Sequence, residues 1–271
     1  MKFEADWLAL REPADRGARS VALMRGAAYW LRRAETPVVV DLGCGRGASR
    51  RAFGAEARAA LWRLVDRDAE LLDLAVADAG AHGERHLLDL SDIDALLLDG
   101  ASLVTCSALL DLMPASWLEA LAERLAAGGL GFHAALSYDG RMRWSPGPAP
   151  REAELLAAFN GHQLRDKGLG PALGPQAAAI LAERLRARGY RVRVERSDWQ
   201  LHPKEAALQS ELATGVAAAA KDCGCDAEGW LQARLAAIAA GVSSAVVGHV
   251  DLLALPEASS AQSKITSVSS P

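Results

Sequence analysis

The sequence predicts an α/β fold in which a mainly parallel sheet of seven strands carries helices on both faces. Short runs of β-branched residues and leucine alternate with Ala/Leu/Arg stretches from Thr36 onward, and such alternation is typical of strand–helix–strand units. A length of 271 residues with 51% hydrophobic residues allows a sizeable core. The predicted strands are 37–42, 61–66, 85–90, 102–107, 129–136, 190–199 and 244–255.

The main domain is expected over residues 36–257, after a helical preface over residues 1–35. Residues 137–174 are rich in Gly and Pro and form a predicted insertion that is long enough to act as a lid over an acceptor site. Residues 203–240 read as two Ala-rich helices inserted between the last two strands. The Ser-rich tail, residues 258–271, is expected to be disordered.

Charge and cysteine content narrow the possible functions. The net charge is −4 with a pI near 5.9, and the absence of a dense Lys/Arg block argues against a nucleic-acid partner. The sequence contains no apolar run of about 18 residues and no secretory signal, so we expect a cytoplasmic protein without a membrane partner. The four cysteines form no CxxC pair, and no metal site is predicted. The sequence does not predict the oligomeric state.

Three local signals predict helix ends and helix faces. Asp68 stands where it would cap the helix that follows the second strand. Ser116 and Glu119 have the spacing of a capping box. Arg11 and Asp15 lie four residues apart and should pair on one face of the preface helix.

The motif with the clearest chemical meaning is Thr-Pro-Val-Val-Val-Asp-Leu-Gly-Cys-Gly-Arg-Gly, residues 36–47. It reads as a buried strand that ends at Asp41 and is followed by three alternating glycines. Glycines let a ligand approach the main chain closely, and the next helix offers free N–H groups. Asp41 suits a cationic group such as an amino-acid ammonium.

The glycine spacing separates two classes of cofactor. A dinucleotide site needs G-x-G-x-x-G, whereas here Gly47 follows Gly45 by only two residues. The motif resembles the D-x-G-x-G-x-G of class I, Rossmann-like methyltransferases that use S-adenosylmethionine, over residues 36–136 and in element order to residue 255. This resemblance implies that the protein binds S-adenosylmethionine and transfers its methyl group to an acceptor.

The same resemblance assigns roles to residues at the next strand ends. Asp66 would accept hydrogen bonds from the ribose hydroxyls, Asp89 would accept one from the adenine amino group, and Ser107 would lie beside the sulfonium. Each acidic residue has a structural alternative, because an Asp at a strand end often caps the next helix. The predicted cofactor site comprises Asp41, Gly43, Cys44, Gly45, Gly47, Asp66, Arg67, Asp89, Leu90 and Ser107.

The acceptor should bind beyond the fourth and fifth strands, where the carboxyl edge of the sheet continues. Asp111 and His162 are the candidate catalytic bases, and each has an ordinary surface or lid role as its alternative. The mixed aromatic and charged residues Tyr138, Arg141 and Trp144 form the predicted substrate surface. The sequence predicts a small-molecule acceptor and does not decide between O, N, C and S methylation.

The sequence is also compatible with other functions. The chain has the cofactor motif but no motif that proves turnover, so a non-catalytic S-adenosylmethionine-binding partner protein is one alternative. A methyltransferase that acts on protein or RNA is another. A relative of the fold that uses decarboxylated S-adenosylmethionine, or none, is a third.

Overall fold

The computed structural model describes residues 5–57, 59–147, 149 and 151–257. The predicted disordered tail, 258–271, lies outside the described residues. Within the described residues eight strands form one sheet. They are β1 (Val38–Leu42), β2 (Leu61–Asp66), β3 (Gly83–Leu87), β4 (Leu103–Ser107), β5 (Gly131–Ser145), β6 (Tyr190–Arg196), β7 (Trp199–Leu201) and β8 (Ser244–Pro256).

The order of the sheet is β3-β2-β1-β4-β5-β8-β6, with β7 paired to β8. Strands β1 to β5 pair in parallel, whereas β8 runs antiparallel to β5, β6 and β7. This confirms the predicted Rossmann-like α/β fold. The predicted strand over 190–199 is split into β6 and β7, because the chain between them turns to bond β8: the Ser197 amide donates to the His249 carbonyl, and the His249 amide to Asp198.

The predicted end of the fifth strand was wrong, since β5 continues nine residues beyond 136, to Ser145. Two irregularities in its pairing with β8 surround Leu136 and Gly140, which have φ values of 57° and 88°. The Leu136 amide donates to the buried Asp251 carboxylate at 2.8 Å, which holds the first irregularity. The strand therefore bends, and it continues through a stretch of charged residues whose sequence is typical of a loop.

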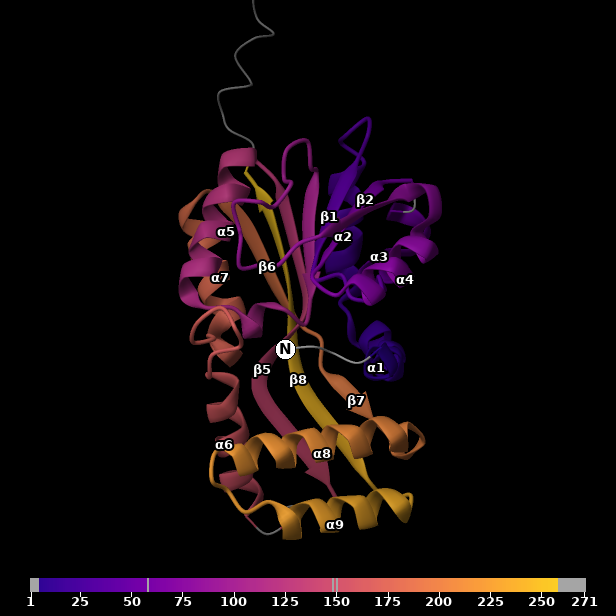
Figure 1. Ribbon diagram of the computed structural model, residues 1–271, viewed down its shortest axis with the longest axis vertical. Helices are drawn as coiled ribbons and strands as arrows, with labels where there is room; N and C mark the ends of the chain where they lie inside the picture. Colours follow the sequence, from indigo (N-terminus) through magenta and orange to yellow (C-terminus); the bar gives the residue numbers. More distant parts are fainter. Residues whose placement is uncertain (1–4, 58, 148, 150, 258–271) are drawn as a thin grey trace, which may run out of the picture.

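Helices cover both faces of the sheet (Figure 1). The first four are α1 (Ala5–Ala18), α2 (Val21–Leu31), α3 (Ala48–Phe53) and α4 (Ala69–Ala79); the others are α5 (Ala115–Gly128), α6 (Glu152–Gln163), α7 (Ala177–Ala187), α8 (Ala206–Asp222) and α9 (Glu228–Ala239).

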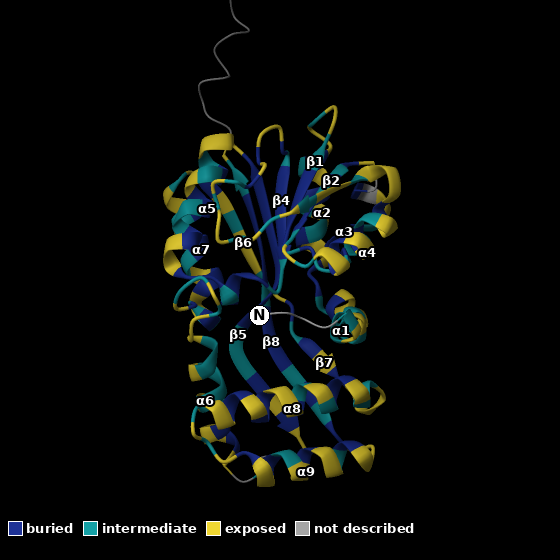
Figure 2. Cartoon of the chain, in the orientation of Figure 1, coloured by how far each residue is buried: buried dark blue, intermediate teal, exposed yellow. Residues whose placement is uncertain are grey.

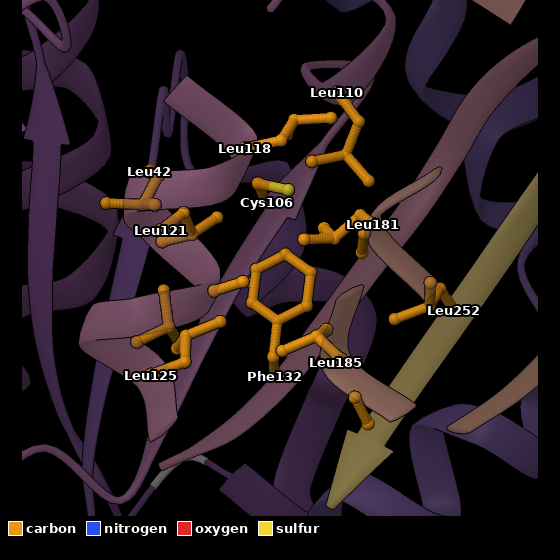
Figure 3. Close-up of a cluster of buried hydrophobic side chains, with 14 of the residues drawn as sticks. Leu42, Cys106, Leu110, Leu118, Leu121, Leu125, Phe132, Leu181, Leu185 and Leu252 are labelled. Atoms are coloured by element: carbon orange, nitrogen blue, oxygen red, sulfur yellow. The ribbon is translucent and has the colours of Figure 1, made fainter. Parts of the chain in front are cut away.

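Three apolar clusters hold these layers together. On one face α5 and α7 pack against Phe132 of β5 with leucines such as Leu121 and Leu185 (Figure 3). On the other face α2, α3 and α4 bury Trp62 and Leu64 of β2. The third cluster lies where β5 and β8 extend beyond the parallel strands and are covered by α8 and α9, whose outer faces are exposed (Figure 2).

The local helix signals had different outcomes. Asp68 caps α4 as predicted, because its carboxylate accepts hydrogen bonds from the amides of Glu70 and Leu71. The predicted capping box at Ser116 was wrong. Pro114 is the N-cap of α5, and the Glu119 carboxylate instead binds arginines of α7. None of the described helices is both long and apolar enough to cross a membrane.

Candidate functional site

A cavity of about 600 Å³ lies at the carboxyl ends of β1, β2 and β4, within the ~300–1,000 Å³ usual for small-molecule sites. Residues of α1 line it on one side, and residues of the loops after β1 to β4 line other parts of it. Its lining includes Leu8, Arg11, Glu12, Asp15, Gly43, Cys44, Gly45, Arg46, Arg51, Asp66, Arg67, Asp89, Leu90, Ser107, Ala108, Leu109, Leu112, Met113, Lys167 and Leu169.

The glycine loop after β1 has the backbone that only glycine adopts easily. Gly43, Gly45 and Gly47 all have positive φ, between 51° and 79°. A Cβ at Gly45 would lie 3.3 Å from the Leu8 side chain, across the cavity wall. Gly43 and Gly45 line the cavity, whereas Gly47 packs against Ala75 of α4 and does not. The loop thus presents main chain to the cavity on one side and lets α4 approach on the other.

The carboxylate of Asp66, at the end of β2, is held by two backbone amides. One oxygen accepts from the Gly45 amide at 2.8 Å and the other from the Asp68 amide at 2.9 Å. A carboxylate has about four acceptor positions. Asp66 therefore links the glycine loop to the start of α4 and keeps acceptor capacity toward the cavity that it lines.

Beyond β3 the cavity wall is formed by Arg67, Asp89 and Leu90. Asp89 is half exposed, accepts a hydrogen bond from the Ser91 amide at 2.9 Å and lies 3.7 Å from the Arg67 guanidinium. The Ser91 bond is the main cause that lowers the Asp89 pKa. The Leu90 carbonyl accepts from the Trp117 indole, which fixes this stretch against α5.

Ser107, the last residue of β4, connects the cavity to a buried arginine. The Arg19 guanidinium, only 4% exposed, donates to the Ser107 Oγ at 2.8 Å. No local sequence pattern indicates this contact, because the two residues are 88 positions apart. The Ser107 hydroxyl thus accepts one hydrogen bond from Arg19 and keeps a second acceptor position and its own O–H donor.

Asp41 lies at the end of β1 but beneath the cavity, and it is not among the residues that line it. Its carboxylate is fully buried beside the Ser49 side chain. Burial raises its pKa to about 7, against the opposing charge of Arg19. Cys44 does line the cavity, and burial raises the pKa of its thiol, so it is not a reactive thiolate.

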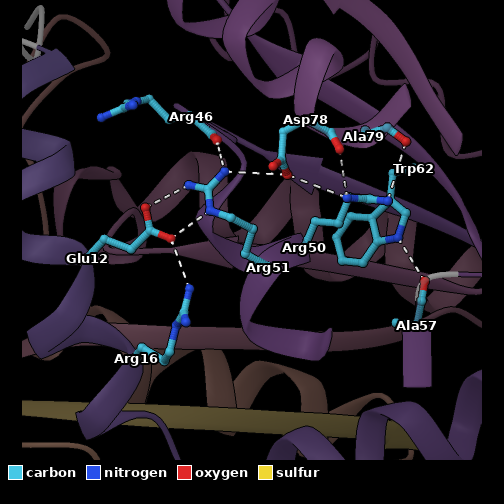
Figure 4. A network of polar contacts seen from close by, with 9 residues as sticks. All are labelled: Glu12, Arg16, Arg46, Arg50, Arg51, Ala57, Trp62, Asp78 and Ala79. Carbon is cyan, nitrogen blue, oxygen red and sulfur yellow. Dashed lines mark hydrogen bonds and ion pairs between the residues drawn. The ribbon is translucent and has the colours of Figure 1, made fainter. Parts of the chain in front are cut away.

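Helix α1 forms the roof through two sets of ionic contacts. Arg11 and Asp15 pair as predicted, at 2.9 and 3.1 Å, and the Trp199 indole of β7 also donates to Asp15. Glu12 binds the Arg51 guanidinium of α3 through both oxygens, at 2.6 and 2.7 Å (Figure 4). The roof is thus tied to α3 and to β7.

The two candidate bases lie close to the cavity without lining it. Asp111, in a short 3-10 helix at Leu110–Leu112, is buried, and burial raises its pKa to about 6. His162 lies near the end of α6, 3.7 Å from Asp222, and burial lowers its pKa. Neither side chain is placed to meet an acceptor directly in this cavity.

The predicted substrate surface does not form at the cavity, because its residues lie on the continued strand β5. The Tyr138 hydroxyl donates to Asn160, and Arg141 pairs with Asp139 and Asp198. Trp144 is buried edge-to-face against Trp230. None of the predicted substrate residues Tyr138, Arg141 and Trp144 is among the residues that line the cavity.

Several cavity residues have no counterpart in the sequence prediction. Leu8 and Glu12 come from α1, and Met113, Lys167 and Leu169 come from segments after β4 and α6. Periodicity marks α1 as helical but does not indicate what it covers. The Asp-Lys-Gly-Leu-Gly run around Lys167 was the one visible signal, since closely spaced glycines often mark a shaped loop.

Comparison with known proteins gives structural matches only. No family model matches the chain, and no curated protein matches its sequence. Among solved structures, a methyltransferase from Geobacter sulfurreducens with S-adenosylhomocysteine is 14% identical (TM-score 0.47, covering 95% of this chain and 100% of that one). A cyclopropane synthase from Mycobacterium tuberculosis is 11% identical (TM-score 0.48, covering 88% and 84%).

A geranyl diphosphate C-methyltransferase from Streptomyces coelicolor is 13% identical, with a TM-score of 0.45 and coverage of 86% and 80%. Likeness at this level does not transfer a substrate or an activity. The fold of this chain is established by its own strand order and directions. That order, with one reversed strand beside β5, agrees with the mainly parallel Rossmann-like sheet that the sequence predicts.

Proposed function

We propose that the protein is an S-adenosylmethionine-dependent methyltransferase with a small-molecule acceptor. The observation that supports this best is the composition of the cavity at the sheet's carboxyl edge. The glycine loop, Asp66 and Asp89 line one side, while Leu109 and Met113 line an apolar side beyond β4. Such a cavity suits a polar nucleoside next to a second, less polar ligand.

The residues present fit this cofactor. Gly43 and Gly45 of the glycine loop line the cavity, and a side chain at either position would meet Leu109 or Leu8. In the proposal Asp66 accepts the two ribose hydroxyls, and Asp89 with the main chain of Leu90 holds the adenine. One guanidinium nitrogen of the buried Arg19 has no hydrogen-bond partner within the described part of the chain. In the proposal Arg19 supplies positive charge near the cofactor carboxylate.

Bound S-adenosylmethionine supplies an activated methyl group, so the chain mainly has to align the acceptor and exclude water. Helix α1 closes the cavity through the Glu12–Arg51 contact. Ser107 offers an oriented hydroxyl at the expected position of the sulfonium. Because Asp111 and His162 do not line the cavity, we propose that the acceptor arrives in an already nucleophilic form.

The test is a transfer assay with methyl-labelled S-adenosylmethionine and a small-molecule extract. We expect label in the small-molecule fraction for the wild type and its loss in Gly45→Val, whose side chain would meet Leu8. The melting temperature of the variant serves as the folding control. Cofactor binding without any transfer would favour the non-catalytic alternative, and label in protein or RNA would overturn the small-molecule acceptor.

A further inference from the structure

The short loop after α6 is shaped by its own side chain–backbone bonds. The Asp166 carboxylate accepts hydrogen bonds from the amides of Gly168 at 2.7 Å and of Gly170 at 2.9 Å. Both glycines have φ near 105°, a conformation that other residues rarely adopt. The loop therefore has a defined shape, and its two intervening side chains, Lys167 and Leu169, line the cavity.

Lys167 is a half-buried cation without a carboxylate partner among the described residues. Its Nζ donates to the His162 carbonyl at 3.0 Å and lies 3.4 Å from the His162 ring. By contrast, Arg11 and Arg51, which also line the cavity, are paired with Asp15 and Glu12. Two further lining cations, Arg46 and Arg67, belong to the side of the glycine loop and β3, where Arg46 donates to the Ala5 carbonyl and Arg67 lies 3.7 Å from Asp89. Lys167 is the lining cation that comes from the loop after α6, on the side beyond β4.

The surroundings of Lys167 in the cavity are apolar. Leu109, Leu112, Met113 and Leu169 form the nearby wall beyond β4. Desolvation lowers the pKa of Lys167, with Arg165 adding to the effect, while the buried Asp111 opposes it at longer range. A bound anion would restore the favourable environment that the ammonium lacks.

We propose that Lys167 binds the carboxylate of the acceptor, and that the acceptor is a small apolar carboxylic acid. This inference rests on the proposed function, because it names the substrate class of the same cavity. The apolar wall accommodates the body of the molecule, and the ammonium neutralises its single charge. A lysine presents a point charge and suits a carboxylate, whereas phosphate sites commonly use several donors or an arginine fork.

The experiment measures binding of octanoate, phenylacetate and phenylbutyrate by calorimetry in the presence of saturating S-adenosylhomocysteine. Each acid is compared with the corresponding alcohol. We expect at least one acid to bind clearly more tightly than its alcohol, and this preference to fall about tenfold in Lys167→Met. Lys167→Arg should retain part of it, and Lys221→Met, at an exposed lysine of α8, should change nothing.

The result separates the two proposals. If no acid is preferred over its alcohol, or if the preference survives in Lys167→Met, the carboxylate site is wrong even though S-adenosylhomocysteine binds. If S-adenosylhomocysteine fails to bind but an acid binds in a Lys167-dependent way, the proposed function fails and the anion site stands. Binding of S-adenosylhomocysteine to each variant serves as the folding control.

Discussion

Asp66 joins the glycine loop to α4 and lines the cavity, so it is the residue whose removal should affect cofactor binding most directly. We predict that Asp66→Ala weakens S-adenosylhomocysteine binding about 30-fold or more, because hydrogen bonds to a charged group contribute roughly 1.5–3 kcal/mol each. Asp73→Ala, which removes an exposed carboxylate paired with Arg85, is the control. Equal affinities of the two variants in calorimetry would contradict the assignment.

Asp41 gives a prediction about stability and pH. Its folded-state pKa of about 7 lies above the ordinary value of 3.8, so the folded protein keeps a proton that the unfolded chain has released. The free energy of unfolding should therefore fall as pH rises from about 4 to 7, by a few kcal/mol at most. Asp41→Asn should remove this dependence.

Urea unfolding of wild type and Asp41→Asn at pH 5 and pH 8, without ligand, measures the effect. The variant should be more stable than the wild type at pH 8, and the difference should shrink at pH 5. A difference that does not change with pH would show that Asp41 is already ionised in the fold, balanced by Arg19.

Residue-scale features that depend on neighbours in sequence were predictable. The Asp68 cap and the Arg11–Asp15 pair involve residues within four positions, and the structure contains both. The partner of Arg19 is 88 residues away, at Ser107, and no local pattern indicates it. The same holds for Lys167, whose position depends on how α6 returns to the cavity.

At the scale of elements, α1 is the part that closes the site. The bidentate Glu12–Arg51 contact is mostly buried and should hold α1 with about 1–2 kcal/mol. We predict that Arg51→Met increases hydrogen exchange over residues 5–18 and weakens S-adenosylhomocysteine binding several-fold. Arg16→Met removes only an exposed 3.4 Å contact to the same carboxylate, so hydrogen exchange and S-adenosylhomocysteine binding should both stay unchanged in it. If the two variants had similar effects, the Glu12–Arg51 contact would not be what holds α1 over the cavity.

The elements also show where sequence patterns stop being informative. Strands β1, β2 and β4 were located to within a residue, because each is a buried run bounded by turn residues. The second half of β5 was read as a lid, since Asp139, Gly140 and Arg141 resemble loop residues. In the structure Arg141 forms ion pairs with Asp139 and Asp198, and Gly140 has the positive φ at the irregularity in the strand pairing. The polar stretch therefore remains part of the strand.

At the scale of the whole molecule, the extension of β5 and β8 has its own core, held by a buried ion pair. Arg234 of α9 binds Glu152 at the start of α6, and its guanidinium lies beside the contacting rings of Trp144 and Trp230. We predict that Arg234→Met lowers the free energy of unfolding by roughly 3–5 kcal/mol, because Glu152 is left buried without its partner.

The double variant Arg234→Met with Glu152→Gln should recover much of this loss. The exposed pair between Arg193 and Glu195 is the comparison, and Arg193→Met should cost less than about 1 kcal/mol. Urea unfolding of the wild type and of these three variants measures each free energy of unfolding. A small loss in Arg234→Met, similar to that of Arg193→Met, would mean that water reaches the Glu152 carboxylate.

Cofactor binding in the cavity at the carboxyl edge is the central claim. Its most direct test is calorimetric titration of the purified protein with S-adenosylmethionine and S-adenosylhomocysteine, with NAD as the control. We predict micromolar binding of both sulfur compounds, weakened in Asp66→Ala, and no binding of NAD. Binding of NAD alone, or equal binding of both sulfur compounds by wild type and Asp66→Ala, would contradict the assignment of the glycine loop and Asp66 to this cofactor.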